Sequence, residues 1–225
     1  MLRRESKALF YLIAGPLMKV NSLIHRHLRP RKKEALRVHL GPGQQNYMQG
    51  WVNVDANMFT AKCDIWADLK NALPFDDATV TAIYSHHVIE HLPNLEYHFR
   101  EAYRCLKPGG IYRVGGPNGD SAIARFVAND HAWFGSFPDN RKSIGGRLEN
   151  FIFCKQEHLT ILTFTFLEEL MLKAGFVDIS PCLASKETNA PDLFDQCLLL
   201  EPESNFIFPH TIIVEGQKPK AHAND

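Results

Sequence analysis

Short apolar runs alternate with turn-forming residues through the middle of the chain. Five of these runs predict β-strands, over residues 36–40, 51–54, 63–67, 80–84 and 110–114. Between the last two, apolar residues recur at helical spacing over 95–106, until Lys107-Pro-Gly-Gly110 ends the pattern. Strands that alternate with crossovers predict a mostly parallel sheet with both faces covered. A ligand is then expected at the carboxyl ends of the strands.

The last third of the chain continues this alternation and then changes it. Residues 165–176 predict a helix, with a threonine that can cap its start and Gly175 at its end. Two β-rich stretches follow, over 177–180 and 206–214. We expect this pair to close the sheet, with one of its strands antiparallel. The expected fold is therefore α/β, with a seven-stranded, mostly parallel sheet whose last strand is antiparallel.

Composition and charge narrow the class of protein. The 225 residues are 45% hydrophobic and 22% charged, with a formal net charge of zero, which is typical of a globular protein. Residues 1–33 carry nine Lys and Arg against one Glu, a net charge of +8, so the remaining residues sum to −8. Because the positive charge is confined to the N-terminal segment and the rest of the chain is acidic, a nucleic-acid groove in the main domain is not expected.

Cysteine usage bears on the compartment. The chain has five cysteines, an odd number, spread widely and without a C-x-x-C pair: Cys63, Cys105, Cys154, Cys182 and Cys197. This pattern favours reduced thiols in a cytoplasmic protein over a disulfide framework or a zinc site.

The basic segment 1–33 contains an apolar run over residues 8–18. This run has about half the length of a membrane-spanning helix, is interrupted by Gly15-Pro16, and is followed by no clear cleavage site, so we expect no secretion. Three interpretations stay open: an amphipathic segment on an anionic membrane surface, a lid over the active-site mouth, or a helix docked on the flank of the domain. At the other end, residues 219–225 are expected to form a flexible tail.

The strongest chemical signal is the run Leu36-Arg-Val-His-Leu-Gly-Pro-Gly43, followed twelve residues later by Asp55 at the end of the second strand. Glycines at such a turn let the backbone approach a ligand, and a carboxylate there accepts hydrogen bonds from ribose hydroxyls. Only residues 44–50 separate Gly43 from the second strand, room for about one helical turn. The helix terminus that binds a pyrophosphate is then largely missing, which favours a ligand without a pyrophosphate over NAD.

An ordered set of motifs extends this signal downstream. They are Leu40-Gly-Pro-Gly43, Gly50-Trp-Val-Asn-Val-Asp55, Asp68-Leu69, Leu73-Pro-Phe-Asp-Asp77, Tyr84-Ser-His-His-Val-Ile-Glu-His-Leu92 and Leu106-Lys-Pro-Gly-Gly110. This set resembles class I S-adenosylmethionine-dependent methyltransferases, above all the small type 11-like enzymes associated with bacterial surface-sugar pathways. The resemblance implies a Rossmann-like, doubly wound sheet, a methyltransferase domain over 34–218, S-adenosylmethionine as donor and S-adenosylhomocysteine as product.

The resemblance also implies roles for individual residues. Asp55 would hold the ribose, Asp68 the adenine amino group, and the backbone amide of Leu69 the adenine ring. The full set expected at the donor is Leu40, Gly41, Pro42, Gly43, Asp55, Ala56, Asp68, Leu69, Ser85 and His86. Asp55 as a turn carboxylate and Asp68 as a helix cap are the structural alternatives.

Four further residues are candidates for catalysis. On a helical turn, His87, Glu90 and His91 share one face at spacing i, i+3, i+4, and an imidazole there could take a proton from an acceptor hydroxyl. In some related oxygen methyltransferases a Glu-x-x-Glu-His motif binds a divalent metal. Here His87 replaces its first Glu, which weakens the metal hypothesis without removing it, so we assign no metal ligands. His158 either reaches the acceptor pocket or caps a local turn.

The acceptor side is expected in the aromatic-rich insertion 124–160, either as a lid or as an ordinary packed insert. We expect an enzyme that methylates a small molecule, such as a sugar hydroxyl or a glycolipid intermediate, with peripheral membrane contact through residues 1–33 and no nucleic-acid partner. A non-catalytic donor-binding protein and a nucleic-acid or protein methyltransferase that uses the basic leader are the alternatives.

Overall fold

The computed structural model describes residues 4–28, 35–57, 59 and 61–221. Residues 1–3 and 29–33 of the basic segment and the last four residues of the expected tail lie outside these residues. The helices are α1 Arg4–Leu23 with a π-helical turn Ile24–Leu28, α2 Leu95–Cys105, α3 Gly119–Val127, α4 Ile144–Phe153, α5 Phe164–Ala174 and α6 Pro191–Leu198, with a 3₁₀ turn over Ile89–His91. The strands are β1 Leu36–Leu40, β2 Val52–Asp55, β3 Ile65–Trp66, β4 Val80–His86, β5 Leu106–Pro117, β6 Val177–Cys182 and β7 Thr211–Gln217.

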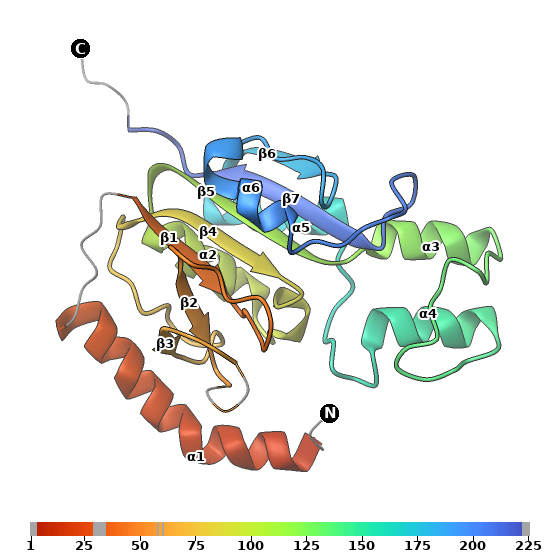
Figure 1. Ribbon diagram of the computed structural model, residues 1–225, viewed down its shortest axis with the longest axis horizontal. Helices are drawn as coiled ribbons and strands as arrows, with labels where there is room; N and C mark the ends of the chain where they lie inside the picture. Colours follow the sequence, from red (N-terminus) through yellow and green to blue (C-terminus); the bar gives the residue numbers. More distant parts are fainter. Residues whose placement is uncertain (1–3, 29–34, 58, 60, 222–225) are drawn as a thin grey trace.

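All seven strands form one sheet in the order β3-β2-β1-β4-β5-β7-β6 (Figure 1). Strands β1 to β5 pair in parallel, whereas β7 runs antiparallel to both of its neighbours, β5 and β6. The expected α/β fold, with a mostly parallel seven-stranded sheet and an antiparallel last strand, is therefore confirmed.

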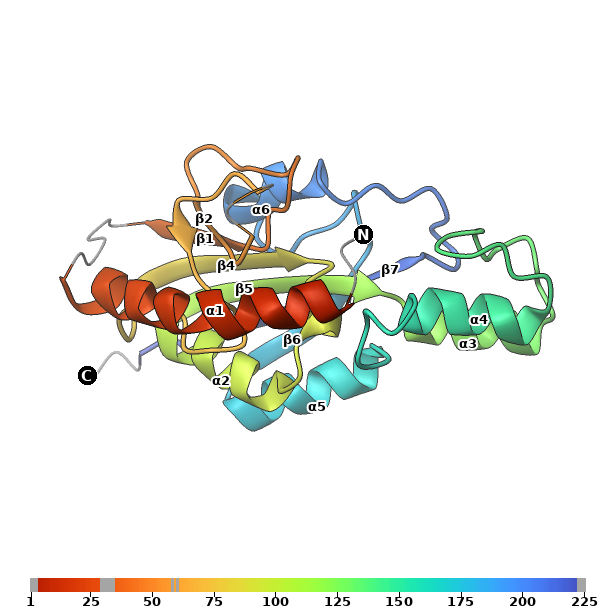
Figure 2. The same cartoon turned by 90° about the horizontal axis from the view of Figure 1, so that it is seen from below.

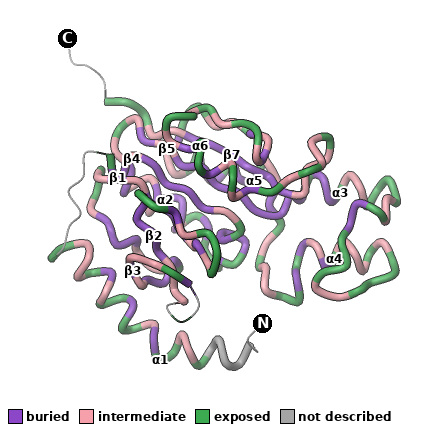
Figure 3. Tube along the Cα trace, viewed as in Figure 1, coloured by how far each residue is buried: buried purple, intermediate pink, exposed green. Residues whose placement is uncertain are grey.

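Helices cover both faces of the sheet, with α6 on one side and α2 and α5 on the other (Figure 2). Because both faces are covered, the central strand β4 is buried over almost its whole length, and the buried core follows the middle of the sheet (Figure 3). Helix α2 turns Leu95, Phe99 and Ala102 into the main core, which is why its apolar residues recur at helical spacing.

Local signals set most of the element ends. The Asn94 side chain accepts a hydrogen bond from the Tyr97 backbone N–H and caps α2. Helix α5 begins one residue earlier than predicted because Thr163, and not Thr165, is its cap. Gly175 ends it with a φ of 103°, as expected.

Several predicted bounds were wrong where a distant partner decides them. Strand β5 begins at Leu106 and not at 110, β3 has only two residues, and β7 covers Thr211–Gln217 and not 206–214. Residues 44–50 form turns without a helix, so the truncated first crossover is confirmed.

Helix α1 lies beside β3 at the edge of the sheet (Figures 1 and 2) and continues through Gly15-Pro16. Met18 and Ala14 are buried against the domain, and the Asn21 side-chain amide donates a hydrogen bond to the Trp66 carbonyl at 2.8 Å. At the end of the helical segment, Arg26 pairs with Asp77 at 3.2 Å. Among the residues that the structure describes, no helix has the length and apolar character needed to cross a membrane.

Helices α3 and α4 project from the carboxyl end of β5 and carry a small core of their own (Figure 1). Trp133, Phe134 and Ile152 are buried in it. The Trp133 ring stacks on His210, which directly precedes β7, at 4.3 Å between centroids. The insertion is thereby fixed to the carboxyl end of the sheet.

Candidate functional site

The glycine loop after β1 is held open by its backbone. Gly41 has a φ of 71° and donates its N–H to the Val54 carbonyl at 2.8 Å. A Cβ at Gly41 would lie 2.4 Å from Cγ2 of Val88, closer than real side chains approach. Gly43, with a φ of 57°, has open space where its Cβ would be. Gly41 is therefore required by the close approach of Val88, whereas Gly43 leaves bare backbone facing open space that a ligand could occupy.

Asp55, at the end of β2, ties this loop to the neighbouring strand. Its Oδ2 accepts a hydrogen bond from the Gly43 N–H at 3.0 Å, and its Oδ1 accepts one from the Asn57 N–H at 2.8 Å. An ionised carboxylate has about four acceptor positions, so about two remain for a ligand hydroxyl.

Asn53, which the sequence analysis did not single out, fixes the short segment between β1 and β2. It is fully buried, accepts a hydrogen bond from the Met48 N–H, and donates to the carbonyls of Met48 and Trp51. The Asp64 carboxylate in turn accepts the Asn53 backbone N–H at 2.8 Å. In the absence of a helix in the first crossover, the Asn53 side chain provides hydrogen-bond partners for the backbone of this segment.

A cavity of about 710 Å³ opens at the ends of β1 and β2. Among the expected donor residues, Gly41, Gly43, Asp55, Ala56, Asp68 and Leu69 line it. His87 and His91, expected in catalysis, line it too. The lining that was not predicted comes from Phe10, Tyr11, Asn57, Phe59, Lys70, Val88, Leu92 and Glu157.

Helix α1 forms one wall of this cavity. The Phe10 ring meets the Phe59 ring edge to face at 6.3 Å, and Nζ of Lys70 lies 3.8 Å from the centre of the Tyr11 ring. Burial, with further contributions from the negative charges of Asp68 and Asp55, raises the pKa of Tyr11 to about 12. The Tyr11 hydroxyl therefore stays protonated at neutral pH and can donate a hydrogen bond.

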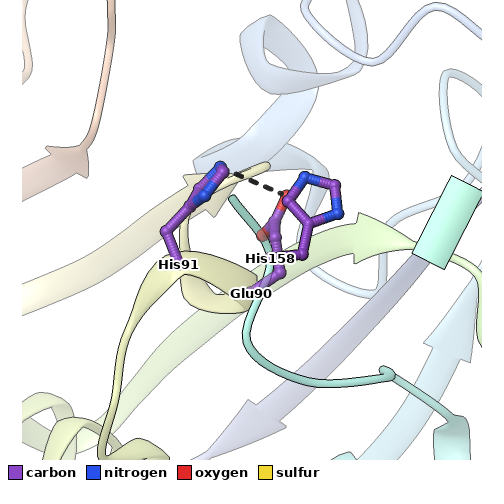
Figure 4. Close-up of side chains that lie close together, drawn as sticks. All are labelled: Glu90, His91 and His158. Carbon is purple, nitrogen blue, oxygen red and sulfur yellow. Dashed lines mark ion pairs between the residues drawn. The ribbon is translucent and has the colours of Figure 1, made fainter. Parts of the chain in front are cut away.

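We call this cavity the donor cavity, after the ligand expected there. Next to it, the other three candidate catalytic residues gather around the fourth, Glu90 (Figure 4 shows Glu90 with His91 and His158). The Glu90 side chain is buried, and its Oε1 lies 3.2 Å from Nδ1 of His87 and 4.0 Å from Nε2 of His91. Its Oε2 is buried without a hydrogen-bond partner. The His158 ring meets the His91 ring edge to face at 4.9 Å.

The predicted helical turn over residues 87–91 was wrong in its details. His87 has a φ of 55°, in the left-handed region, and the 3₁₀ turn begins only at Ile89. His87 adopts this conformation while its N–H donates to the Gly115 carbonyl at the end of the neighbouring strand. His87, Glu90 and His91 are neighbours as predicted, but a left-handed residue followed by a short 3₁₀ turn brings them together, and not a common helical face.

Backbone carbonyls orient two of the imidazoles. Nδ1 of His91 lies 2.8 Å from the Glu157 carbonyl oxygen, and Nδ1 of His158 lies 2.9 Å from that of Ile152. Because a carbonyl only accepts, both nitrogens carry the proton and both Nε2 atoms are left with a lone pair. Burial, as the largest cause, lowers the pKa of His158 below its usual range, which favours the neutral ring.

Glu90, His91 and His158 could also hold a metal ion. Each offers one ligand atom, and these atoms all lie within 4.8 Å of one another. Histidines whose other nitrogen donates to a carbonyl are typical of metal ligands. These three side chains are therefore chemically suitable as metal ligands, although the sequence analysis assigned none.

Comparison with known proteins identifies the domain. Residues 23–114 match a family model described as a methyltransferase domain. A solved S-adenosylmethionine-dependent methyltransferase from Thermotoga maritima is similar over 96% of both chains, with a TM-score of 0.54 and 17% identity. Residues 23–114 thus match a methyltransferase domain, and the chain as a whole has the fold of S-adenosylmethionine-dependent methyltransferases. No curated protein matches the sequence.

Other solved structures share the methyltransferase fold. Phosphoethanolamine N-methyltransferase 2 from Haemonchus contortus, in complex with phosphomonomethylethanolamine and S-adenosylhomocysteine, is similar over 90% of this chain and 53% of its own, with a TM-score of 0.52 and 16% identity. A Haloferax volcanii complex of the Trm112 methyltransferase activator with a methyltransferase is similar over the full length of both chains, with a TM-score of 0.51 and 16% identity.

S-adenosylmethionine and S-adenosylhomocysteine are bound in solved Haemonchus contortus methyltransferases that share this fold, which agrees with the expected donor and product. The residues in the donor cavity fit S-adenosylmethionine. The cavity has the volume of a typical cofactor site, a glycine loop without side chains forms one part of it, and the Asp55 and Asp68 carboxylates are in reach of it.

Four of the expected donor residues of the methyltransferase do not line the cavity: Leu40, Pro42, Ser85 and His86. Ser85 is fully buried, and its hydroxyl lies 2.9 Å from the Tyr112 hydroxyl, which in turn lies 2.8 Å from Nε2 of His98. His86 stacks over the Tyr84 ring, and burial lowers its pKa to about 3. Successive side chains of β4 point to opposite faces, so Ser85 and His86 cannot both face one ligand.

A second cavity, of about 790 Å³, lies between the insertion of the methyltransferase and the segment before β7. Trp133, Arg147 and Phe151 from the insertion line it together with Glu203 and His210. The side chain of Glu203 is almost fully buried, and its Oε1 lies 3.4 Å from Nδ1 of His210. The aromatic residues expected on the acceptor side thus serve both as packing and as cavity wall.

Proposed function

We propose that this methyltransferase transfers a methyl group from S-adenosylmethionine to a hydroxyl of a small-molecule acceptor, a sugar or a glycolipid intermediate. The observation that carries the proposal is the buried Glu90 carboxylate against His87, at the wall of the donor cavity. A hydroxyl must lose its proton when it is methylated, and this pair can receive it.

When bound, S-adenosylmethionine supplies an electrophilic methyl group on a sulfonium. The bond between sulfur and the methyl carbon breaks as a bond from the acceptor oxygen to that carbon forms, and the hydroxyl proton leaves to a base. Positive charge disappears in this step, so the protein mainly has to align the two reactants and exclude water. The glycine loop, Asp55 and Asp68 serve the alignment on the donor side in this proposal.

His87 is the proposed base. A carboxylate only accepts hydrogen bonds, so Nδ1 of His87 donates to Glu90 and Nε2 keeps its lone pair. The side chain of His87 is 45% exposed, whereas that of Glu90 is 1% exposed, so the proton can arrive at the imidazole and be stabilised by the buried charge. Glu90 is then a positioning residue.

His91 and His158 complete the proposed catalytic group. Their Nε2 lone pairs face the space beside Glu90 and can accept hydrogen bonds from the acceptor hydroxyl. Glu90, His91 and His158 could instead hold a divalent cation, which would supply Lewis-acid activation of the acceptor hydroxyl as a second mode of catalysis.

The acceptor side of the proposal is the insertion 124–160, expected to act as a lid. It is supported by the aromatic cavity that Trp133 and Phe151 line, because sugar rings and apolar chains both pack against aromatic faces. Arg147 also lines this cavity and can pair with an anionic group of the acceptor.

The proposal also includes the setting of the enzyme. A cytoplasmic location is supported by the dispersed, free cysteines. A peripheral membrane contact through residues 1–33 is supported by the net charge of +8 on that segment.

The test uses purified full-length protein, methyl-labelled S-adenosylmethionine, and acceptor panels of glycosides, sugar nucleotides and extracted glycolipids, with amines and nucleic acids as comparison. We expect label in a hydroxyl-bearing panel. His87→Gln and Glu90→Gln should lower kcat by about 10²- to 10⁴-fold, while the dissociation constant for S-adenosylmethionine changes less than about twofold.

Glu169→Gln, on the exposed side of α5, is the matched control and should retain full activity. Transfer into amines or nucleic acids alone would contradict a hydroxyl acceptor. Full activity of Glu90→Gln would contradict the proposed proton route even if the acceptor is right.

A further inference from the structure

Helix α1 has an apolar face that packs against nothing in the part of the chain that the structure describes. Six large apolar residues spaced three or four apart lie on this outer face: Leu9, Leu12, Ile13, Leu17, Val20 and Leu23. Each is between 48% and 74% exposed. An apolar stripe of this kind on a helix is typical of a surface that is covered in use.

The opposite face of the same helix is part of the enzyme. Ala14 and Met18 are buried against the domain, and Asn21 is bonded to Trp66 at the sheet edge. One turn earlier, Phe10 and Tyr11 line the donor cavity. Helix α1 therefore joins two surfaces, an outer apolar stripe and an inner wall of the donor site, through a single rigid element.

The positive charge of residues 1–33 favours an anionic bilayer over a second copy of this chain as the partner of the outer face. Residues 1–33 carry a net charge of +8, and within α1 the exposed Lys19 borders the stripe. A second copy of this chain that packed on the stripe in a symmetric dimer would bring the same positive charge against it. An anionic bilayer provides both an apolar interior for the stripe and negative headgroups for the charges.

We propose that the outer face of α1 docks on an anionic lipid bilayer and that docking holds Phe10 and Tyr11 in place over the donor cavity, so that the methyl donor binds more tightly at the membrane. The helix lies in the plane of the bilayer surface. This inference rests on the proposed donor site and goes beyond it in assigning a surface, a lipid class and a consequence for donor binding.

Coupling follows from the shared helix. A helix held on the domain by a few contacts spends part of its time away from the cavity, and donor affinity falls by the fraction of time that the complete wall is absent. Burial of Leu12 and Ile13 in lipid fixes α1 in the plane of the bilayer with its inner face toward the tethered domain, so fewer orientations remain in which Phe10 and Tyr11 lie away from the cavity. The membrane then acts as a second ligand that favours the complete donor site.

The experiment measures vesicle binding and donor binding on the same samples. Full-length protein is sedimented with vesicles of phosphatidylglycerol and phosphatidylcholine, or of phosphatidylcholine alone, and the dissociation constant for S-adenosylmethionine is measured by equilibrium dialysis with and without vesicles. The outer-face variant is the double substitution Leu12→Gln with Ile13→Gln. The matched control is Leu172→Gln with Ile207→Gln, which removes two exposed apolar residues outside both cavities and the insertion.

We expect the protein and the control to bind anionic vesicles and the outer-face variant to bind at least about tenfold more weakly. Donor affinity should rise about threefold or more with anionic vesicles in the protein and the control, but not in the outer-face variant. Without vesicles, all three should bind the donor equally, because Leu12 and Ile13 face away from the cavity.

Other results overturn the inference. Equal binding to neutral vesicles, an equal loss in the control, or unchanged donor affinity on vesicles would each contradict it. A dimer in light scattering that the outer-face variant abolishes would assign the face to a second copy. Donor binding without vesicle binding would contradict this inference alone, whereas no donor binding under any condition would contradict the donor site itself.

Discussion

The carboxylate of Asp55 accepts a hydrogen bond from the backbone N–H of Gly43 at 3.0 Å, so the acid and the glycine loop are joined before any ligand contacts them. The same carboxylate also holds the Asn57 N–H at 2.8 Å. A donor that enters meets a loop that is already shaped, and less ordering entropy is lost on binding. Asp55 thus supports the loop, in addition to its proposed role as an acceptor of hydrogen bonds from the ligand.

Replacement of Asp55 by Asn should therefore weaken donor binding by about 10- to 100-fold, because a charge-assisted hydrogen bond is lost and one backbone donor loses its partner. Calorimetric titration with S-adenosylmethionine measures this. Asp195→Asn on the exposed side of α6 is the control and should bind as the unmodified protein does. Unchanged affinity of the Asp55→Asn variant would remove Asp55 from the donor site.

Two glycines of the same loop separate backbone strain from steric overlap. Gly43→Ala meets open space at a φ of 57° and should cost about 1 kcal/mol of unfolding free energy from the backbone alone. Gly41→Ala places its methyl 2.4 Å from Cγ2 of Val88 and should cost at least about 2 kcal/mol.

Urea denaturation measures both variants. Val88→Ala added to Gly41→Ala should recover part of the loss, because it removes the atom that the new methyl meets. Equal costs at the two glycines would show that the overlap with Val88 relaxes without penalty.

How much of this molecule follows from its sequence depends on whether the signal is local. The runs 36–40 and 80–84 are largely apolar because strands that are buried on both faces must be. Strand β1 covers 36–40 and β4 begins at 80, as these local patterns predicted. The start of β5 is different. Lys107-Pro-Gly-Gly110 has the composition of a stop, but the Lys218 segment pairs with it through the Gly109 N–H and the Gly110 carbonyl.

The candidate site divides in the same way. Gly41, Gly43 and Asp55 could be found because a glycine turn and a strand-end acid carry their chemistry within twenty residues. Phe10 and Tyr11 could not be found, because their place at the cavity depends on contacts of α1 with residues some 45 positions away, such as Asn21 with Trp66. A local pattern does not reveal which face of such a helix is covered.

Removal of divalent ions separates the two catalytic modes around Glu90. We expect methyl transfer to survive dialysis against EDTA, because His87 and Glu90 provide a base without a metal. Activity that is lost and then restored by one divalent ion would instead place that ion on Glu90, His91 and His158. In that case Ala at His158 should lower the affinity for the ion, measured by calorimetry without substrate.

A buried ion-pair cluster makes the half of the sheet around β7 sensitive to a single substitution. Arg113 donates to both oxygens of Glu201, at 2.8 and 2.6 Å, and to Glu215 at 2.6 Å, with all three side chains almost fully buried. Arg113→Met leaves two carboxylates buried without a counter-charge and should cost about 3–5 kcal/mol of unfolding free energy.

Lys173→Met is the surface comparison for Arg113, since the pair of Lys173 with Glu96 has a similar distance of 2.8 Å but is largely exposed. That substitution should cost less than about 1 kcal/mol. Urea denaturation followed by circular dichroism measures both variants. Costs of equal size would show that the buried cluster is not a main support of the fold.

The last prediction concerns acid stability and rests on His98, which is buried beside Tyr112. Burial lowers the pKa of His98 to about 4 from its ordinary value of 6.5. Below pH 6.5 the unfolded chain therefore binds a proton at this residue that the folded chain does not, so the free energy of unfolding falls as the pH drops from 6.5 toward 4 and changes no further below that. Between pH 8 and pH 5, His98 should account for a loss of about 2 kcal/mol of unfolding free energy.

The variant His98→Gln tests this, because glutamine keeps a partner for the Tyr112 hydroxyl but does not titrate. Urea midpoints across this range should decline less steeply in that variant, while the difference between the two proteins at pH 8 reports packing alone. Parallel pH profiles would show that the pKa of His98 is the same in the folded and the unfolded protein.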